Sequence, residues 1–290
     1  MEYFEPRTIG DALAVLARYG ERARVIAGGT DVMVDMKYKE EPECLVNIKR
    51  ISGLREIREN GGSVSVGPLA TIRQLEANPS VRARLPVLWD ACRQFASLQI
   101  RNTATIGGNV CRASPSGETL APLLVLEALG TLAFPEGERR EPLRGFFHGP
   151  GRTSLGGSGL LTKIEIPYPK DGSAGVYLKH AVRGPMDIAV VGVAVLLVPD
   201  EAGDTVAEAR IGLGAVAPTP IRASGAEEAL RGRPLTAALA AEAAGMAAAE
   251  ASPISDQRAS AEYRRWIVET LVRRGLEQAW RKATGKEVAR

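Results

Sequence analysis

The stretch from Ile100 to Glu118 is the feature that most limits what this chain can fold into. It is polar and contains the pair Gly107-Gly108, although apolar, helix-like sequence flanks it on both sides. Paired glycines let a backbone pass close to a ligand and turn its amides toward it. The stretch is also rich in short, uncharged polar side chains: Thr103, Thr105, Asn109, Ser114 and Ser116. It therefore predicts either a glycine-rich surface turn or a cradle for a diphosphate.

A second glycine loop favours the cradle. Ala27-Gly28-Gly29-Thr30-Asp31 follows a short apolar strand at 24–27 and precedes apolar residues at helical spacing in 31–36. The order strand, glycine turn, helix places backbone amides at a helix start, where anions bind well.

Composition excludes several classes of protein. The 37 basic and 34 acidic residues give a net charge of +3, which is too balanced for a nucleic-acid surface. Aromatic residues make up only 5% of the chain, so a base-stacking platform is not expected either. Cys44, Cys92 and Cys111 form no CxxC pair, which argues against a metal cluster or a disulfide framework.

Targeting and membrane signals are not expected. The first residues, Met1–Pro6, have neither the basic start nor the apolar core of a signal peptide. The longest apolar run, 188–198, is too short to span a bilayer and predicts a buried strand. We therefore expect a cytoplasmic, reduced protein with no transmembrane segment and no nucleic-acid partner.

Hydrophobic periodicity and turn residues predict an α+β protein with two domains. The boundary falls at 167–175, which holds two prolines and two glycines. We expect a first domain at 1–170, with subdomains at about 1–55 and 56–170, and a C-terminal α+β domain at 175–285. The first domain is predicted to hold strands at 44–48, 63–67, 131–134 and 160–167, a loop-rich segment at 135–159, and helices at 8–20, 71–78, 86–95 and 119–129.

Capping signals support several of these helices. Thr8 is a predicted N-cap, Thr71 with Gln74 and Ser224 with Glu227 match the capping box, and Gly20 and Gly130 are placed to end helices. In the C-terminal domain the predicted strands are 176–181, 188–198 and 206–216, and the predicted helices are 225–231, 234–250 and about 262–282.

The usual protein-borne chemistries are missing from the sequence. It has no G-x-S-x-G motif, and its two histidines, His148 and His180, are predicted to be structural. The histidines and cysteines never cluster as zinc ligands would. Neither the Walker A nor the G-x-G-x-x-G pattern occurs. We therefore predict no catalytic residue and no metal ligand, but a bound cofactor that carries the chemistry.

Ala27–Asp31 together with Ile100–Asn109 resembles the FAD-binding (medium) subunit of molybdenum hydroxylases. This family includes the medium subunits of carbon monoxide dehydrogenase, xanthine dehydrogenase and 4-hydroxybenzoyl-CoA reductase. The resemblance runs from residue 4 to about residue 280 and continues through Ala113–Glu118, Leu160–Tyr168, Arg183–Ala189, Gly214–Pro220 and Ser255–Arg265. It implies a two-part FAD-binding α/β domain of the vanillyl-alcohol-oxidase-like (PCMH) type. A small α+β domain with a three-stranded antiparallel sheet and a three-helix bundle would follow.

The resemblance also implies which residues hold FAD. The diphosphate would lie between the two glycine loops, and the amides of the second loop would offset its charge. Lys179 would approach the isoalloxazine and stabilise reduced flavin, which raises its reduction potential. Glu118 stands where the family usually has Asp, whose carboxylate bonds cofactor hydroxyls. The implied FAD contacts are Val25, Ile26, Ala27, Gly28, Gly29, Thr30, Asp31, Val32, Phe95, Thr105, Ile106, Gly107, Gly108, Asn109, Glu118, Leu161 and Lys179.

Some of these residues have a purely structural interpretation. Leu161 lies on an alternating strand and is otherwise a core residue. Lys179 alternates with Tyr177 and is otherwise a solvated strand residue. Arg183 and Asp187 are predicted to form a structural ion pair in the turn after that strand.

The resemblance implies an electron-transfer subunit of a three-subunit oxidoreductase that assembles as a dimer of heterotrimers. A molybdopterin subunit would transform the substrate, and a small subunit would relay electrons through two [2Fe-2S] clusters. This chain would exchange those electrons with NAD or a quinone. Two alternatives remain at this point. One is a self-contained flavoprotein oxidase of the vanillyl-alcohol-oxidase type, with Cys111 as the nearest candidate for a covalent flavin link. The other is an assembly scaffold that has lost FAD.

Overall fold

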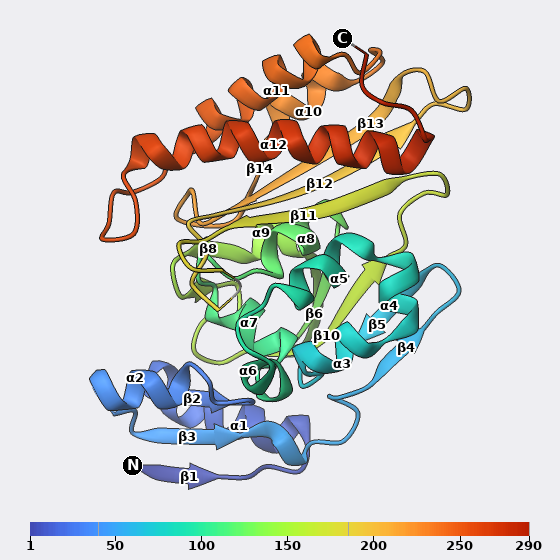
Figure 1. Ribbon diagram of the computed structural model, residues 1–290. Coiled ribbons are helices and arrows are strands. Elements are labelled where there is room, and N and C mark those ends of the chain that lie inside the picture. The colour runs from blue at the N-terminus through green and yellow to red at the C-terminus, as the bar shows by residue number, and fades with distance from the viewer. Residues whose placement is uncertain (40, 185, 290) are drawn as a thin grey trace. The chain divides into compact units, whose positions relative to one another are not determined.

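The computed structural model describes residues 1–39, 41–184 and 186–289, which fold into two compact units (Figure 1). The segments of the two units alternate along the chain. Unit 1 comprises Met1–Ala77, Ser97–Ser114 and Glu127–Pro167. Unit 2 comprises Asn78–Ala96, Pro115–Leu126 and Tyr168–Arg290.

Unit 1 is built on two larger sheets and a small two-stranded one. The first is parallel, with the order β1-β3-β2, and consists of β1 (Glu2–Phe4), β3 (Cys44–Asn47) and β2 (Ala23–Ile26). The second is antiparallel, with the order β4-β5-β10-β6-β7, and consists of β4 (Ile57–Glu59), β5 (Ser63–Val66), β10 (Leu160–Pro167), β6 (Leu129–Phe134) and β7 (Gly137–Pro142). The remaining elements of unit 1 are α1 (Ile9–Tyr19), η1 (Gly20–Arg22), α2 (Val32–Tyr38), η2 (Ile48–Arg50), α3 (Ile72–Ala77), α6 (Leu98–Thr103), α7 (Ile106–Arg112), α9 (Leu143–Phe146), β8 (Phe147–Gly149) and β9 (Arg152–Thr153).

Two predicted helix starts in unit 1 are confirmed by their capping hydrogen bonds. The Thr8 hydroxyl accepts from the Asp11 amide at 3.1 Å, and α1 ends at Gly20 with a φ of 56°. The Thr71 amide donates to Gln74 Oε1 at 2.9 Å, and the Gln74 amide donates to Thr71 Oγ1 at 3.1 Å. This reciprocal pair is the predicted capping box, which satisfies two amides that the helix itself cannot.

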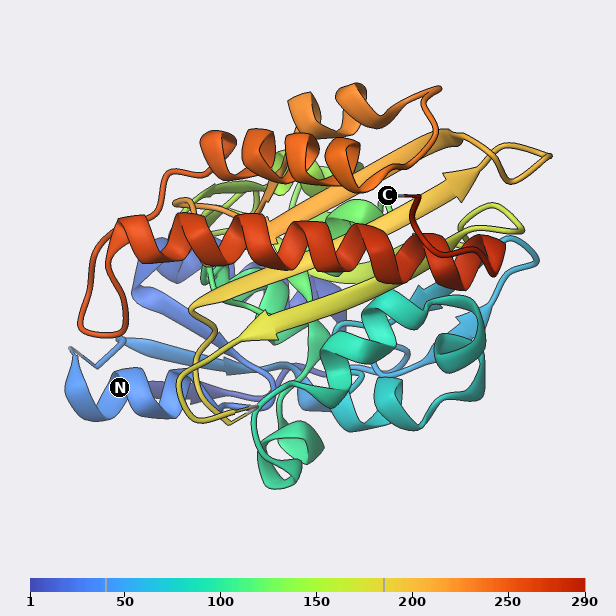
Figure 2. The same ribbon diagram turned by 45° about the horizontal axis from the view of Figure 1, so that its top comes forward.

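Unit 2 is built on one antiparallel sheet covered on both faces. Its strands, in the order β11-β12-β13-β14, are β11 (Ala174–His180), β12 (Val191–Pro199), β13 (Val206–Gly214) and β14 (Ile221–Arg222). Figures 1 and 2 show α10 (Ser224–Leu230), α11 (Ala237–Glu250) and α12 (Ala261–Thr284) on one face of this sheet. The helices α5 (Pro86–Arg93) and α8 (Leu120–Val125) pack on its strands as well, and α4 (Pro79–Arg84) precedes α5.

Glycines show that these helices use opposite faces of the sheet. Gly275 of α12 packs on Val195, since a Cβ there would lie 2.8 Å from Val195 Cγ2. Gly212 packs on α8, since a Cβ there would lie 2.6 Å from Ala121 O. Val195 pairs with Ile211, the neighbour of Gly212 in β13, and successive residues of a strand point to opposite faces. The two helix layers therefore lie on opposite sides.

Several predicted elements differ from the structure. The segment 135–159 is not loop-rich, because it contains β7, α9, β8 and β9. Exposed edge strand β7 carries no alternating apolar pattern, which is why periodicity missed it. Gly130 does not end a helix: α8 stops at Val125, and Gly130 lies in β6, where it pairs with both Ile164 and Glu141.

Three further expectations need correction. The central stretch is not simply a glycine-rich turn, because it contains α6 and α7. The pair Ser224 and Glu227 does not form a capping box: the Glu227 carboxylate instead accepts from the Ile211 amide at 2.8 Å and pairs with Arg222. The sheet of unit 2 has a fourth strand, β14, because Ile221 and Arg222 pair with β13. Within the described parts of the chain, no helix combines the length and hydropathy that crossing a bilayer requires.

Candidate functional site

The two glycine loops meet inside unit 1. Gly28 lies directly against the end of α6, because a Cβ at this position would be only 2.1 Å from Thr103 O and 3.2 Å from Ala104 Cα. No other amino acid fits such an approach, since real Cβ atoms never come that close to a backbone oxygen. The folded chain thus brings the first loop against the residues that lead into the second.

The first loop presents a row of unpaired backbone amides. Within the described residues, the amides of Gly28, Gly29, Thr30 and Asp31 have no hydrogen-bond acceptor. Gly29 adopts a φ of 79°, a conformation that favours glycine and turns successive amides to one side. Residues 27–30 are half-buried, and partly buried amides without a partner are costly. This loop fits an anionic ligand.

Most amides of the second loop are engaged. The Ile106 amide donates to Ala70 O at 3.0 Å, and the Gly107 amide donates to Pro68 O at 3.0 Å. The Thr105 hydroxyl caps α7 by accepting from the Gly108 amide at 3.0 Å, while the Asn109 amide donates to Thr105 O at 3.0 Å. The amides of Gly107, Gly108 and Asn109 therefore already have acceptors within the protein, and their role toward a diphosphate stays a prediction. A ligand can still approach the backbone of this loop closely and contact its polar side chains.

The two glycines of the second loop have different tasks. Gly107 is buried, and a Cβ there would lie 2.3 Å from Pro68 Cβ and 2.7 Å from Pro68 O. Gly107 is therefore required by the packing of the protein itself. Gly108 is exposed, and a Cβ there would meet only Thr105 Oγ1, at 2.9 Å. Of the pair, Gly108 is the one whose missing side chain leaves room for a ligand.

Two other predicted site residues come together in unit 2. Lys179 Nζ donates to Glu118 Oε1 at 2.9 Å and to Gln94 O at 3.2 Å. The side chain of Lys179 is only 2% exposed, and that of Glu118 is 12% exposed. The alternative in which Lys179 is a solvated strand residue is therefore wrong. Burial, and after it the Glu118 carboxylate, raise the pKa of nearby Tyr177 well above its usual value, so this phenol stays protonated.

The remaining predicted contacts are placed as follows. Leu161 of β10 is buried in the core of unit 1, and Phe95 is buried in unit 2. Val25, Ile26 and Val32 flank the first loop and are half-buried, whereas Ile106 is fully buried.

The predicted ion pair after β11 is confirmed. Arg183 Nη2 lies 2.7 Å from Asp187 Oδ1, and the Arg183 amide donates to Asp187 Oδ2 at 2.7 Å. Pro185, which belongs to the same segment, lies outside the described residues.

Cysteine and histidine chemistry does not compete for this site. Burial raises the pKa of the Cys111 thiol to about 12, so the thiol stays protonated and is a poor nucleophile for a flavin link. His148 is exposed and contacts Ser154 Oγ at 3.0 Å, and His180 contacts the Tyr263 hydroxyl at 3.2 Å. Over the described residues, no group of His, Cys, Asp and Glu side chains could hold a metal ion.

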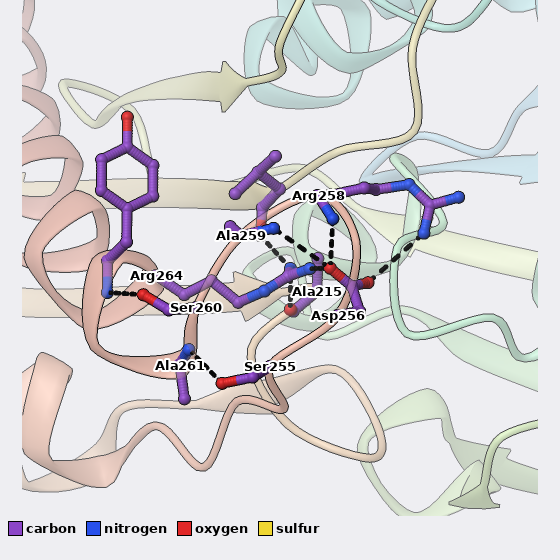
Figure 3. A network of polar contacts seen from close by, with 10 residues as sticks. Ala215, Ser255, Asp256, Arg258, Ala259, Ser260, Ala261 and Arg264 are labelled. Carbon is purple, nitrogen blue, oxygen red and sulfur yellow. Dashed lines mark hydrogen bonds and ion pairs between the residues drawn. The ribbon is translucent and has the colours of Figure 1, made fainter.

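The segment Ser255–Arg265 serves the fold of unit 2 (Figure 3). Arg264 is buried and donates from Nη1 to Val190 O at 2.6 Å and to Ala215 O at 3.1 Å. Its Nη2 donates to Asp256 Oδ1 at 2.8 Å. The motif thus ties the start of α12 to both strands of the β12–β13 hairpin at its open end.

This network predicts an acid-sensitive contribution to stability. Burial alone would raise the pKa of Asp256, but the Arg258 and Ala259 amides and the Arg264 guanidinium outweigh it and lower the pKa to about 2. A carboxyl group whose pKa is lower in the folded state stabilises the protein at pH values above its unfolded pKa. This stabilisation is lost as the pH falls through the folded pKa. Asp256→Asn should therefore cost unit 2 about 2 kcal/mol at pH 7, and the difference from the wild type should shrink between about pH 4 and pH 2.

The measurement is urea unfolding followed by tryptophan fluorescence. All three tryptophans, Trp89, Trp266 and Trp280, lie in unit 2, so their fluorescence reports on this unit alone. Asp204→Asn is the matched control, because its partner Lys286 is on the surface and the Asp204 side chain is 68% exposed. A pH-independent difference between Asp256→Asn and wild type would contradict the assignment.

Comparison with known families agrees with this geometry. The family described as "FAD binding domain in molybdopterin dehydrogenase" matches residues 1–169, and "CO dehydrogenase flavoprotein C-terminal domain" matches residues 176–279. The chain is 36% identical to the carbon monoxide dehydrogenase medium chain of Hydrogenophaga pseudoflava over 96% of each chain. It is 32% identical to the putative xanthine dehydrogenase FAD-binding subunit XdhB of Escherichia coli, covering 98% of this chain and 97% of that one.

Solved structures extend the likeness to the whole fold. Carbon monoxide dehydrogenase from Hydrogenophaga pseudoflava superposes with a TM-score of 0.93 at 37% identity, covering 97% of each chain. Quinoline 2-oxidoreductase from Pseudomonas putida superposes with a TM-score of 0.91 at 29% identity, covering 98% of each chain. The chain, which carries two glycine loops and a fold shared along its length with these relatives, belongs to the FAD-binding medium subunits of the molybdenum hydroxylase family and is an FAD-containing oxidoreductase subunit.

Proposed function

We propose that this chain is the cytoplasmic electron-transfer subunit of a three-subunit molybdenum hydroxylase, assembled as a dimer of heterotrimers. It takes electrons from the [2Fe-2S] clusters of a small subunit and passes them to an external acceptor, NAD or a quinone. Substrate chemistry takes place on a molybdopterin-containing large subunit. The observation that carries this proposal is the row of unpaired amides at Gly28–Asp31 beside the second glycine loop.

The division of labour is supported by what the described residues lack. No group of His, Cys, Asp and Glu side chains among them could hold a metal ion, and we assign the iron–sulfur centres to another chain. Bound FAD supplies the redox chemistry, since it exchanges electrons one or two at a time. The named relatives are medium chains or FAD-binding subunits of dehydrogenases, which is the position that we propose for this chain.

We assign the FAD contacts by the same reasoning. In unit 1 the first loop, Val25–Val32, binds the diphosphate with its amides. The second loop, Thr105–Asn109, contributes close approach at Gly108 and its polar side chains, and Leu161 backs the site. In unit 2, Phe95, Glu118 and Lys179 contact the cofactor. The low nucleophilicity of Cys111 favours a flavin held without a covalent bond over the self-contained oxidase. We also place the domain boundary between residues 170 and 175, in the gap between the two family matches.

The test is a side chain at Gly108. Gly108→Val should weaken FAD binding by at least about 100-fold, because its methyl groups fill the exposed side of the second loop. FAD binding is measured by titrating the apoprotein and following flavin fluorescence. Tryptophan fluorescence of the apoprotein should be unchanged, because all tryptophans lie in unit 2.

Gly62→Val is the matched control in unit 1. Gly62 lies in the exposed turn between β4 and β5, and nothing lies within 4 Å of a Cβ built there. This variant should bind FAD like the wild type. Unchanged FAD affinity in Gly108→Val would refute the assignment of the second loop, and a wild-type apoprotein that takes up no FAD would refute the proposed function.

A further inference from the structure

One arginine connects the helices that follow the two glycine loops. Arg112 lies in the last turn of α7, which begins at the second loop. Its Nη1 and Nη2 donate to the two carboxylate oxygens of Asp35 on α2, at 2.5 and 3.2 Å. Its Nε lies 3.5 Å from Oδ1 of Asp31, the last residue of the first loop. A bidentate contact of this kind fixes both the distance and the relative orientation of the two side chains.

The same arginine offsets two negative charges beside the unpaired amides. Asp31 and Asp35 carry carboxylates within one turn of the first loop, and these would repel a diphosphate bound to its amides. Lys39 Nζ also contacts Asp35, at 2.9 Å, but both residues belong to the same helical segment. Among the described residues that contact these two carboxylates, only Arg112 comes from the second loop's helix.

We propose that Arg112 is a positioning residue for FAD: it holds the first glycine loop against the second and cancels the charge of Asp31 and Asp35, so that the loop amides accept a diphosphate. The inference rests on the proposed function, because it takes the two loops to be the diphosphate site. Arg112 itself binds the protein and not the cofactor. Its effect on FAD is therefore exerted through Asp31 and Asp35.

The test compares FAD affinity in Arg112→Gln, Asp35→Asn and the double variant. Arg112→Gln should weaken FAD binding about ten-fold, the effect of losing one hydrogen bond between charged groups. Asp35→Asn should weaken binding less, because it removes one repelling carboxylate together with the link. The double variant should be no weaker than Arg112→Gln alone, since both changes break the same contact.

Salt separates a charge effect from a merely structural one. In Arg112→Gln the carboxylates are no longer offset, so raising the salt concentration to about 1 M should screen them and restore part of the lost FAD affinity. Arg58→Gln is the matched control, because Arg58 makes an exposed ion pair with Glu56 at 2.5 Å in the same unit, far along the chain from either loop. This control should bind FAD like the wild type at every salt concentration.

The outcomes distinguish the two proposals. If the wild type fails to bind FAD, the proposed function fails. If the wild type binds FAD and Arg112→Gln binds it equally well, the role of Arg112 is overturned while the proposed function stands. A loss of affinity in Arg112→Gln that salt does not reduce would also overturn it, because misfolding of the loops would not be reversed by screening.

Discussion

Lys179→Met is expected to destabilise unit 2 by about 3–5 kcal/mol, because it leaves the Glu118 carboxylate buried without its cation. The two side chains are 2% and 12% exposed, so water cannot replace the lost partner effectively. Urea unfolding followed by tryptophan fluorescence measures the effect in the apoprotein. Lys170→Met is the control: this lysine pairs with Glu208 at 3.3 Å but is 70% exposed, and its loss should cost little.

A second comparison, of Lys179→Met with Glu118→Gln, tests the role that we propose for Lys179 toward the flavin. Lys179→Met should lower the reduction potential of bound FAD by on the order of 30 mV, a ten-fold shift for a two-electron couple. Glu118→Gln should raise the potential, because it removes a negative charge from the same place. Redox titration of the flavin absorbance measures both. Shifts of the same sign in the two variants would show that the change reflects loosened packing and not the charge of Lys179.

The second large effect is expected for Arg264→Met. This substitution leaves Val190 O and Ala215 O without their donor and removes the buried cation that pairs with half-buried Asp256. Breaking such a buried pair costs about 3–5 kcal/mol. Urea unfolding followed by tryptophan fluorescence should show the loss, and hydrogen exchange should speed up first in α12.

Arg258→Met is the matched control for Arg264. Arg258 also pairs with Asp256, at 3.3 Å, but its side chain is 34% exposed and donates to no carbonyl across the sheet. The control variant should lose less than about 1 kcal/mol. An equal loss in both variants would mean that the charge of Asp256, and not the link from α12 to the β12–β13 hairpin, carries the stability.

The sequence correctly predicted those features that depend only on residues close together along the chain. Thr8 and the pair Thr71 and Gln74 cap their helices as expected, because a capping hydrogen bond needs only neighbours along the chain. The alternation of 160–167 predicted β10, whose inward residues Ile164 and Ile166 are buried. Elements that depend on distant partners were missed. The polar edge strand β7 exists because β6 is beside it, and Gly130 lies in a strand because two neighbours pair with it.

The candidate site divides in the same way. The glycine pattern and the family resemblance indicated both loops, and comparison with relatives established FAD. The hydrogen bonds could not be predicted. The amides of Ile106 and Gly107 donate to Ala70 and Pro68, which are more than 30 positions away along the chain. The sequence alone therefore could not show that these amides already have acceptors within the protein. The partnership of Lys179 with Glu118 likewise depends on a sheet and a helix segment that are far apart along the chain.

The alternation of the two units along the chain has a consequence for biosynthesis. All six residues of α8 are buried, and α8 packs on β12 and β13, which leave the ribosome long after it. The strands of unit 1 are complete once β10 has emerged, so this unit can close during translation. Until β12 and β13 are synthesised, the apolar residues of α8 lack the sheet that buries them. A nascent chain that stalls after residue 167 therefore exposes the apolar helix α8. We expect chaperone binding to matter most during this interval of synthesis.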